Sequence, residues 1–273
     1  LDPVFIFLFD MGVAGAAIAT VIAQILSCTF AICFLLSKKP QIRISFGNYS
    51  SGIILRIISI GLSPFLILAT DSVIMIVMNS VLQRTGGGKA DMLITAATIV
   101  QSYMLLITGP LGGISGGTQA IISFNYGAGK TDRVREAEKK ILLMCVIFTV
   151  VMFIASRFLA ETFAGIFISG SEEIALAGWG IRAFTLAIIP LAFQYALVDG
   201  LTAMGRTKTA LSLSMFRKFS YAILIAVFAF ALGAQNAFYA EPVVDLAGGV
   251  MSTSIFLLVF EKHMRSRLET EII

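Results

Sequence analysis

The chain has 273 residues, of which 58% are hydrophobic and only 13% are charged, and its mean hydropathy is +0.92. Soluble domains carry about 25% charged residues, so the composition excludes an ordinary soluble protein and predicts a membrane protein. The net charge of +4 is not gathered in a basic patch interleaved with aromatic residues, and we expect no nucleic-acid partner.

Apolar stretches recur along the whole chain, with no polar linker that would separate soluble domains. A helix needs about 20 apolar residues to cross roughly 30 Å of hydrocarbon. Seven stretches fit this requirement in chain order: 12–36, 57–82, 92–126, 141–160, 174–204, 219–239 and 243–260. The sequence therefore predicts an all-α fold, a polytopic membrane helical bundle whose seven spans lie in a lipid bilayer.

The start of the chain predicts a fragment of a longer protein. Residue 1 is Leu instead of an initiator Met, and residues 1–11 are typical of the end of an earlier membrane helix with its outer loop. The segment Asp10–Gly15 before the first span resembles Asp245–Gly249 before the last, and duplicated halves are common in transporters. Seven spans would then form one six-helix half, residues 57–260, and the last helix of the other half, residues 12–36.

The third and fifth spans are longer than the bilayer requires, and they contain Pro110 and Pro190. Proline removes one helical hydrogen bond and clashes with the preceding turn, which bends a helix. Glycines around Pro110 recur at four-residue spacing in two stripes, which are Gly109, Gly113 and Gly117, and Gly112 and Gly116. Such stripes pack neighbouring helices closely. Alternatively, Pro110 and Gly113 form a bend that moves during transport, and the sequence leaves both interpretations open.

Basic residues gather after the first, third, fifth and seventh spans, where 16 of the 20 Lys and Arg residues lie. They are Lys38, Lys39, Arg43 and Arg56; Lys130, Arg133, Arg135, Lys139 and Lys140; Arg206, Lys208, Arg217 and Lys218; and Lys262, Arg265 and Arg267. By the positive-inside rule, residues 37–56 form a cytoplasmic linker and residues 261–273 a cytoplasmic tail. Glu241 and Asp245 are assigned to the outer side.

Asp71 is the strongest candidate for a functional residue. It lies in a stretch from Ile57 to Gln83 that has no other ionisable side chain. Placing Asp at the centre of a membrane helix costs about 2.5–3.5 kcal/mol on insertion scales, so its charge needs a partner, a watery cavity, or a proton or cation. Met75 and Met78 follow on nearly the same helical face, and their polarisable side chains suit lipophilic cations. The alternative is a structural carboxylate with both methionines in the core or facing lipid.

Other polar residues within the spans are secondary candidates. Asn79 and Gln101 either line a binding cavity with Asp71 or form hydrogen bonds between helices. Tyr195 and Asp199 follow helical spacing toward the cytoplasmic end, where gating or a structural ion pair fits better than substrate binding. The sequence contains no nucleophile paired with His, no metal-ligand cluster and no phosphate-binding loop. We therefore expect neither an enzyme nor a bound cofactor or metal.

Several motifs resemble the multidrug and toxic compound extrusion (MATE) family of antiporters. They are GPLGGISGGTQAIISFNYGAGKTDRVR from Gly109 to Arg135, Leu1 to Ile6, Met11 to Gln24, Gly61 to Pro64, and DGLTAMGRTK from Asp199 to Lys208. The resemblance implies the C-terminal half of a twelve-helix transporter. Residues 12–36 would be the last helix of the N-terminal lobe, residues 37–56 the inter-lobe linker, and residues 57–260 the C-terminal lobe. The missing N-terminal half would be its partner.

The resemblance also implies a function. Members of this family export drugs or metabolites, often cationic, by alternating access in exchange for sodium ions or protons. A prokaryotic inner membrane is the expected location. Asp71, ten residues after Gly61, falls where one branch of the family has a cavity Glu. Two other membrane classes stay open: a related lipid-precursor flippase, which would need cations in its cavity although no Lys lies in a predicted span, and a seven-helix receptor-like protein.

Overall fold

The computed structural model describes residues 4–5, 9, 11–37, 47 and 50–270. The α-helices are α1 (Gly12–Leu36), α2 (Ser51–Thr85), α3 (Ala90–Gly117), α4 (Gln119–Gly127), α5 (Thr131–Ala164), α6 (Ser171–Phe184), α7 (Ile188–Ala203), α8 (Thr207–Leu232) and α9 (Ala240–Thr270). Short 3-10 helices are η2 (Gly87–Lys89), η3 (Thr185–Ala187) and η4 (Ala234–Tyr239). No strand occurs in the part of the chain that the structure describes.

Seven helical segments among the described residues are long and apolar enough to cross a membrane. They are Ala17–Leu36, Phe65–Thr85, Gly87–Gly127, Thr131–Ala164, Ser171–Ala203, Thr207–Leu232 and Ala234–Phe260. A spanning segment must satisfy its own backbone hydrogen bonds in lipid, and a helix does this within one segment. The prediction of an all-α bundle with seven spans is confirmed.

The chain divides into two compact units, Leu1–Ser59 and Ile60–Ile273. The first unit contains α1 and the beginning of α2. The predicted linker, residues 37–56, and the predicted outer segment, residues 1–11, fall largely outside the described residues. The predicted tail, residues 261–273, continues α9 as far as Thr270.

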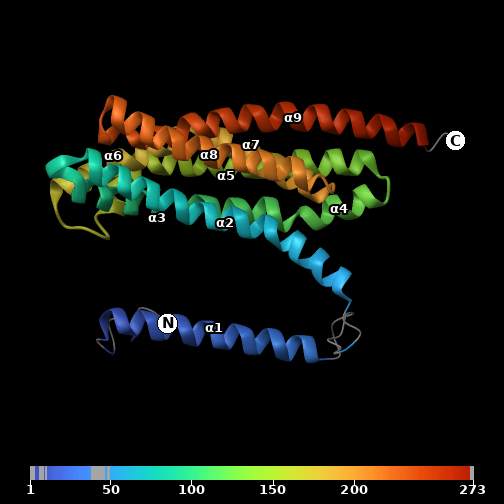
Figure 1. Cartoon of the computed structure of the whole chain (residues 1–273), viewed down its shortest axis with the longest axis horizontal. Coiled ribbons are helices and arrows are strands. Elements are labelled where there is room, and N and C mark those ends of the chain that lie inside the picture. Colours follow the sequence, from blue (N-terminus) through green and yellow to red (C-terminus); the bar gives the residue numbers. More distant parts are fainter. Residues whose placement is uncertain (1–3, 6–8, 10, 38–46, 48–49, 271–273) are drawn as a thin grey trace. The chain divides into compact units, whose positions relative to one another are not determined.

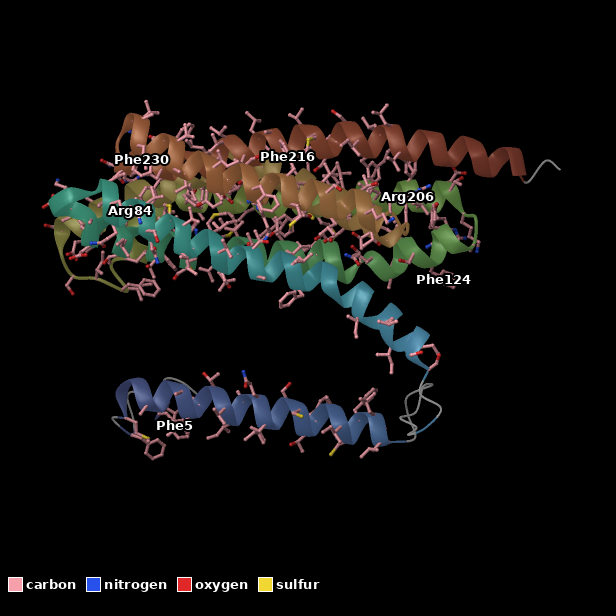
Figure 2. All side chains as sticks on the ribbon, viewed as in Figure 1. Phe5, Arg84, Phe124, Arg206, Phe216 and Phe230 are labelled. Atoms are coloured by element: carbon pink, nitrogen blue, oxygen red, sulfur yellow. The ribbon has the colours of Figure 1, made fainter. Side chains whose placement is uncertain are left out.

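The second unit is a bundle in which the long helices run side by side (Figure 1). Helix α7 packs against both α5 and α9, α6 packs against α3 and α5, and α9 lies along α8. Apolar side chains fill the interior between them, and Phe184, Phe238 and Leu191 are almost fully buried. Many apolar side chains also point outward, among them Phe124, Phe216 and Phe230 (Figure 2). Helices that are apolar all round are typical of a protein whose solvent is the bilayer.

Both long spans, which are longer than the bilayer requires, are interrupted. Helix α3 continues through Pro110 and ends at Gly117, so the interruption lies at Thr118 and not at the proline. The Thr118 hydroxyl donates hydrogen bonds to the carbonyls of Ile114 (2.8 Å) and Ser115 (3.0 Å). A hydroxyl bonded to the preceding turn, together with low-propensity glycines, weakens the helix at this point.

In the fifth span, η3 separates α6 from α7. Pro190 lies in the first turn of α7, where its missing N–H group has no helical partner to lose. A side chain from α5 reinforces the interruption, because Arg157 donates hydrogen bonds to the carbonyl of Arg182 (2.5 Å) and to the Thr185 hydroxyl. The carbonyl at the end of α6 therefore has a partner.

The described helices allow a test of the predicted orientation. Lys130 and Lys208 lie at the starts of α5 and α8, whereas Lys89 and Asn236 lie in η2 and η4, at the opposite ends of neighbouring spans. In a background without native cysteines, single cysteines at the first two positions should react with a membrane-impermeant maleimide only from the cytoplasm. Cysteines at Lys89 and Asn236 should react from outside. Labelling of Lys130→Cys from outside in intact cells would reverse the orientation.

Candidate functional site

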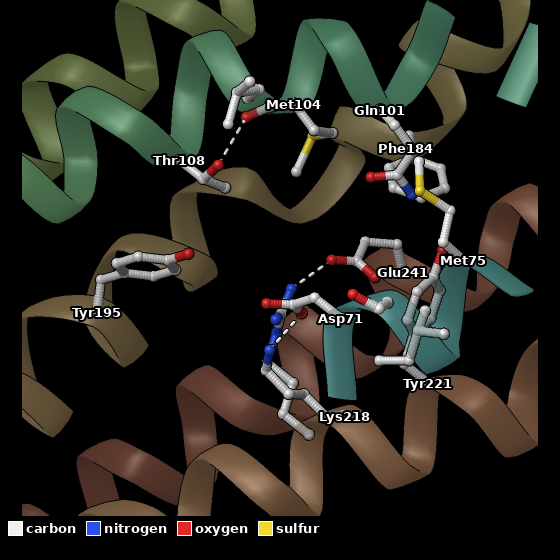
Figure 3. A pocket seen from close by; sticks show the side chains of 14 residues that line it. Asp71, Met75, Gln101, Met104, Thr108, Phe184, Tyr195, Lys218, Tyr221 and Glu241 are labelled. Atoms are coloured by element: carbon white, nitrogen blue, oxygen red, sulfur yellow. Dashed lines mark hydrogen bonds and ion pairs between the residues drawn. The ribbon is translucent and has the colours of Figure 1, made fainter. Parts of the chain in front are cut away.

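A cavity of about 360 Å³ lies among six helices of the second unit (Figure 3). Its residues come from α2, α3, α6, α7, α8 and α9, and they are Asp71, Ser72, Ile74, Met75, Gln101, Met104, Leu105, Thr108, Phe184, Tyr195, Arg217, Lys218, Tyr221 and Glu241. The lining mixes charged groups with aromatic rings and two thioethers. Such a cavity suits an organic ligand that is apolar over most of its surface and charged at one point.

Asp71 has a charged partner in this cavity. The Lys218 ammonium group on α8 forms an ion pair with the Asp71 carboxylate and donates a second hydrogen bond to the Ile67 carbonyl (2.8 Å). The Lys218 side chain is 8% exposed, whereas that of Asp71 is 58% exposed. The carboxylate thus presents one side to the cavity and the other to a buried cation. Asp71 is therefore much more accessible to a ligand than Lys218 is.

A second ion-pair group lies beside the first. The Arg217 guanidinium donates from Nε to Asp245 Oδ1 (2.9 Å), lies 2.7 Å from the same oxygen through its NH2 group, and also pairs with Glu241. Asp245 is fully buried and Glu241 is nearly so. Figure 3 shows Glu241 beside the Asp71–Lys218 pair, with Tyr195 across the cavity.

These contacts correct the charge assignment made from the sequence. Arg217 and Lys218 were predicted in a cytoplasmic loop and Glu241 and Asp245 on the outer side, but all four lie within helices and pair across α2, α8 and α9. A hydropathy scan counts each charge alone and so ends a span at any cluster of them. One feature of the sequence could have indicated that these acids lie within a helix. Glu241 and Asp245 are four residues apart, a spacing that places both on one helical face.

The cluster carries more negative than positive charge. Three carboxylates, Asp71, Glu241 and Asp245, face two cations, Arg217 and Lys218. Oxygens Oε2 of Glu241 and Oδ2 of Asp245 are buried and accept no hydrogen bond from the described residues. Because an uncompensated buried charge is costly, the group is suited to take up one proton or one monovalent cation.

The remaining predicted site residues separate into two sets. Met75, Gln101 and Tyr195 line the cavity with Asp71, whereas Met78 is buried in the core and Asn79 is exposed outside the lining. Pro110 and Gly113 are exposed on α3 and do not line it either. Around Gly113, no described atom lies within 4 Å of where a Cβ would be.

Asp199 lies in a neighbouring cavity of about 320 Å³. Its residues are Ile67, Asp71, Gln194, Tyr195, Val198, Asp199, Ser214, Arg217 and Lys218. The Ser115 hydroxyl of α3 donates a hydrogen bond to Asp199 Oδ2 (2.5 Å). Asp71 and Lys218 line both cavities, so the ion pair stands between them.

Comparison with known proteins identifies the family of the chain. A sequence model of the MatE family matches residues 64–228, which is more than half of the chain. The chain belongs to the MatE family. The multidrug export protein MepA of Staphylococcus aureus (strain MSSA476) is 23% identical over 212 residues, which cover 77% of this chain and 46% of that protein. The chain thus spans about half the length of the curated relatives it matches.

Solved structures of MATE transporters have the same fold. A MATE protein in complex with MaL6 superposes with a TM-score of 0.81 at 19% identity, covering 98% of this chain and 60% of the other. The outward-facing conformation of a multidrug resistance MATE family transporter of the MOP superfamily gives a TM-score of 0.81 at 18% identity, with the same coverage. The resemblance to MATE transporters seen in the sequence is confirmed, and the chain is a multi-pass membrane protein of a transporter family.

The Asp71–Lys218 ion pair predicts that removing one of its charges destabilises the fold more than removing both. Asp71→Asn leaves the buried Lys218 ammonium group without a counter-charge, although the amide oxygen can still accept a hydrogen bond, and it should lower the free energy of unfolding. The loss should stay below the roughly 3–5 kcal/mol of a fully buried pair, because Asp71 is more than half exposed. Adding Lys218→Met should restore part of the loss. Thermal unfolding of the MatE chain in detergent measures this.

The matched control for this pair is on the surface. Lys89 and Glu172 form an ion pair of 3.3 Å in which both side chains are 71% exposed, so Glu172→Gln should change stability little. If the double variant Asp71→Asn with Lys218→Met is no more stable than Asp71→Asn alone, the two side chains are not energetically coupled.

Proposed function

We propose that the chain is one lobe of an antiporter that exports organic, often cationic, drugs or metabolites across a cell membrane in exchange for sodium ions or protons. Membership of the MatE family supports this proposal, as does the similarity to a relative named a multidrug export protein. The expected location is a prokaryotic inner membrane with the C-terminus in the cytoplasm, which the basic segments at the starts of α5 and α8 favour.

One observation carries the proposal: the half-exposed carboxylate of Asp71, in a cluster with more acidic than basic groups, lines a cavity that also has thioether and aromatic walls. Asp71 can attract the charge of a cationic substrate, while Met75, Met104 and Phe184 contact its apolar body. Thioethers adapt to varied shapes because they are flexible and polarisable, and aromatic faces attract cations. Together these groups favour a broad range of lipophilic cations over a single substrate.

The ion pair suggests how exchange would work. With the cavity empty, Lys218 neutralises Asp71, and the excess negative charge lies on Glu241 and Asp245. A cationic substrate entering beside Asp71 is held by that excess. Uptake of a proton or sodium ion by the cluster removes the excess and weakens the hold on the substrate. Binding of ion and substrate would then be mutually exclusive, as antiport requires.

The other wall of the transport path would come from a second lobe. The chain spans about half the length of its curated relatives, and transporter sites lie near the midplane between related halves. We propose that the whole transporter carries an N-terminal half with that wall. Vesicles that contain only the 273-residue chain should therefore show no substrate-dependent efflux.

The lipid-precursor flippase is the second candidate, and the location of Arg217 and Lys218 in the cavity wall gives it support that the sequence lacked. A pyrophosphate group needs cations that are free to bind it. Here Lys218 pairs with Asp71, and Arg217 pairs with two carboxylates. The excess negative charge would repel an anionic lipid, so the antiporter fits this cavity better.

The test is ion-driven efflux by the whole transporter with both lobes. Asp71→Asn keeps the side-chain volume but fixes the charge at zero, and it should lower the initial rate of cation export by about tenfold or more, or about 1.4 kcal/mol in barrier. Asp71→Glu should retain part of the activity. Rates are measured under an imposed sodium or proton gradient and normalised to membrane expression.

Glu172→Gln, an exposed carboxylate paired with Lys89, is the control and should transport at the parental rate. If Asp71→Asn exports a cationic substrate at the parental rate with unchanged ion dependence, Asp71 has only a structural role.

A further inference from the structure

A further buried carboxylate, Glu138, lies outside the cavity that contains Asp71. Glu138 on α5 is only 5% exposed, and neither of its carboxylate oxygens has a hydrogen-bond partner among the described residues. A buried carboxylate without partners is costly to ionise, and in a native structure it calls for an explanation. It either holds a proton or holds a cation.

A second acidic residue, Asp199 on α7, lies near Glu138, and no basic residue forms an ion pair with Glu138. Its carboxylate lies directly against the backbone of Gly200 on α7, where a Cβ would be 2.7 Å from both oxygens. The preceding residue, Asp199, interacts electrostatically with Glu138 and accepts the hydrogen bond from Ser115. Carboxylates from α5 and α7 are thus near enough to interact electrostatically, and no ion pair to either is formed within the described part of the chain.

The other groups that face Glu138 leave this imbalance in place. Its own helix contributes Cys145, and also Arg135 and Lys139, which line a cavity of about 370 Å³ together with Glu138 but are exposed and form no ion pair with it. Arg135 is directed at the Phe260 ring, 5.6 Å from its centroid. From α9, the described residues of this cavity are Thr253, Phe256, Leu257 and Phe260, none of which is ionisable.

Asp199 relates this acid pair to Asp71, whereas Glu138 lines a different cavity. Asp71 and Asp199 line the same cavity of about 320 Å³. Glu138 lies next to Asp199 and lines the other cavity, which is near the start of α5. Three carboxylates therefore follow one another from the cluster with excess negative charge toward that end of the lobe.

We propose that Glu138 and Asp199 form a second binding site for a proton or sodium ion, through which the coupling cation leaves the lobe at the end where α5 begins. Its role in coupling rests on the proposed antiport function. The site itself rests on the orphaned carboxylate, its acidic neighbour and the cavity that Asp199 shares with Asp71. Ser115 also connects it to the end of α3, next to the interruption at Thr118, so occupancy would affect how firmly this junction is held.

Infrared difference spectroscopy of the purified chain tests the site without requiring transport. A protonated carboxyl group has a carbonyl-stretch band that an ionised or sodium-bound carboxylate lacks. We expect one such band to be absent in Glu138→Gln and present in Glu136→Gln, which removes an exposed carboxylate two residues away that pairs with Lys140. Loss of the band on raising the pH alone identifies a proton site. Loss on adding sodium, but not choline, at constant pH identifies a sodium site.

Two results would overturn the proposal. One is a Glu138→Gln spectrum identical to the parental spectrum at every pH and sodium concentration. The other is a Glu138 band that no condition changes, because a permanent proton is only structural. If Glu138→Gln is not monodisperse, Asp199→Asn replaces it. That variant should change the pH or sodium concentration at which the band disappears, and an unchanged midpoint would contradict the pairing.

Transport by the whole protein separates the two proposals. If the parental transporter shows no ion-driven efflux, the antiport function fails, while a titrating Glu138 band still establishes the cation site. If the parent is ion-driven and Glu138→Gln keeps the same ion dependence and rate, the cation does not leave through Glu138. The expected result is loss of ion dependence with substrate binding retained, and Glu136→Gln should behave as the parent.

Discussion

Neutralisation of charge inside a membrane lobe is the constraint on which the rest of this structure depends. Arg217 and Lys218 lie near the middle of α8, where isolated cations would be expensive. Their partners come from helices remote in sequence, with Asp71 on α2 and Glu241 and Asp245 on α9. These ion pairs hold three helices around one cavity and give it polar walls within an apolar bundle.

Function is best sought where the balance of charge is incomplete. The cluster around Arg217 and Lys218 contains three carboxylates and only two cations. Glu138 and Asp199 form no ion pair with a described basic side chain. A purely structural network would be expected to satisfy all of its buried groups, since each orphaned oxygen costs free energy. An excess of acid at two connected positions suits a protein that takes up and releases a small cation.

The helix interruptions lie next to these polar groups. The break at Thr118 follows Ser115, whose hydroxyl bonds to Asp199, and η3 is held by Arg157 of α5. At the first break the Thr118 hydroxyl bonds to carbonyls of the preceding turn, and at the second Arg157 from α5 bonds to the Arg182 carbonyl, so freed backbone groups are satisfied inside the bundle. Binding at the acid pair is consequently close to a position where the backbone can change direction.

The sequence by itself determined the class and the span count. A long apolar run has only the helix available to it in a bilayer, and a lone Asp71 in such a run is conspicuous because of its cost. The lengths and prolines of the third and fifth spans indicated helices that are not straight single spans. Their positions were not evident, because Thr118 breaks its helix through local hydroxyl bonds while Pro110 stays within α3.

Only the tertiary structure decided which charges belong to the site. Lys218 and Glu241 were predicted to lie in loops, because a hydropathy scale scores every charge alone. Their charges are neutralised by residues on other helices, which come together only when the chain folds. Glu138 lies in a segment with many basic residues, where nothing in the sequence distinguishes it. In the structure it is buried, because Gly200 on α7 leaves room for its carboxylate. Contacts between residues distant in the chain set burial and pairing, and no pattern within one segment contains that information.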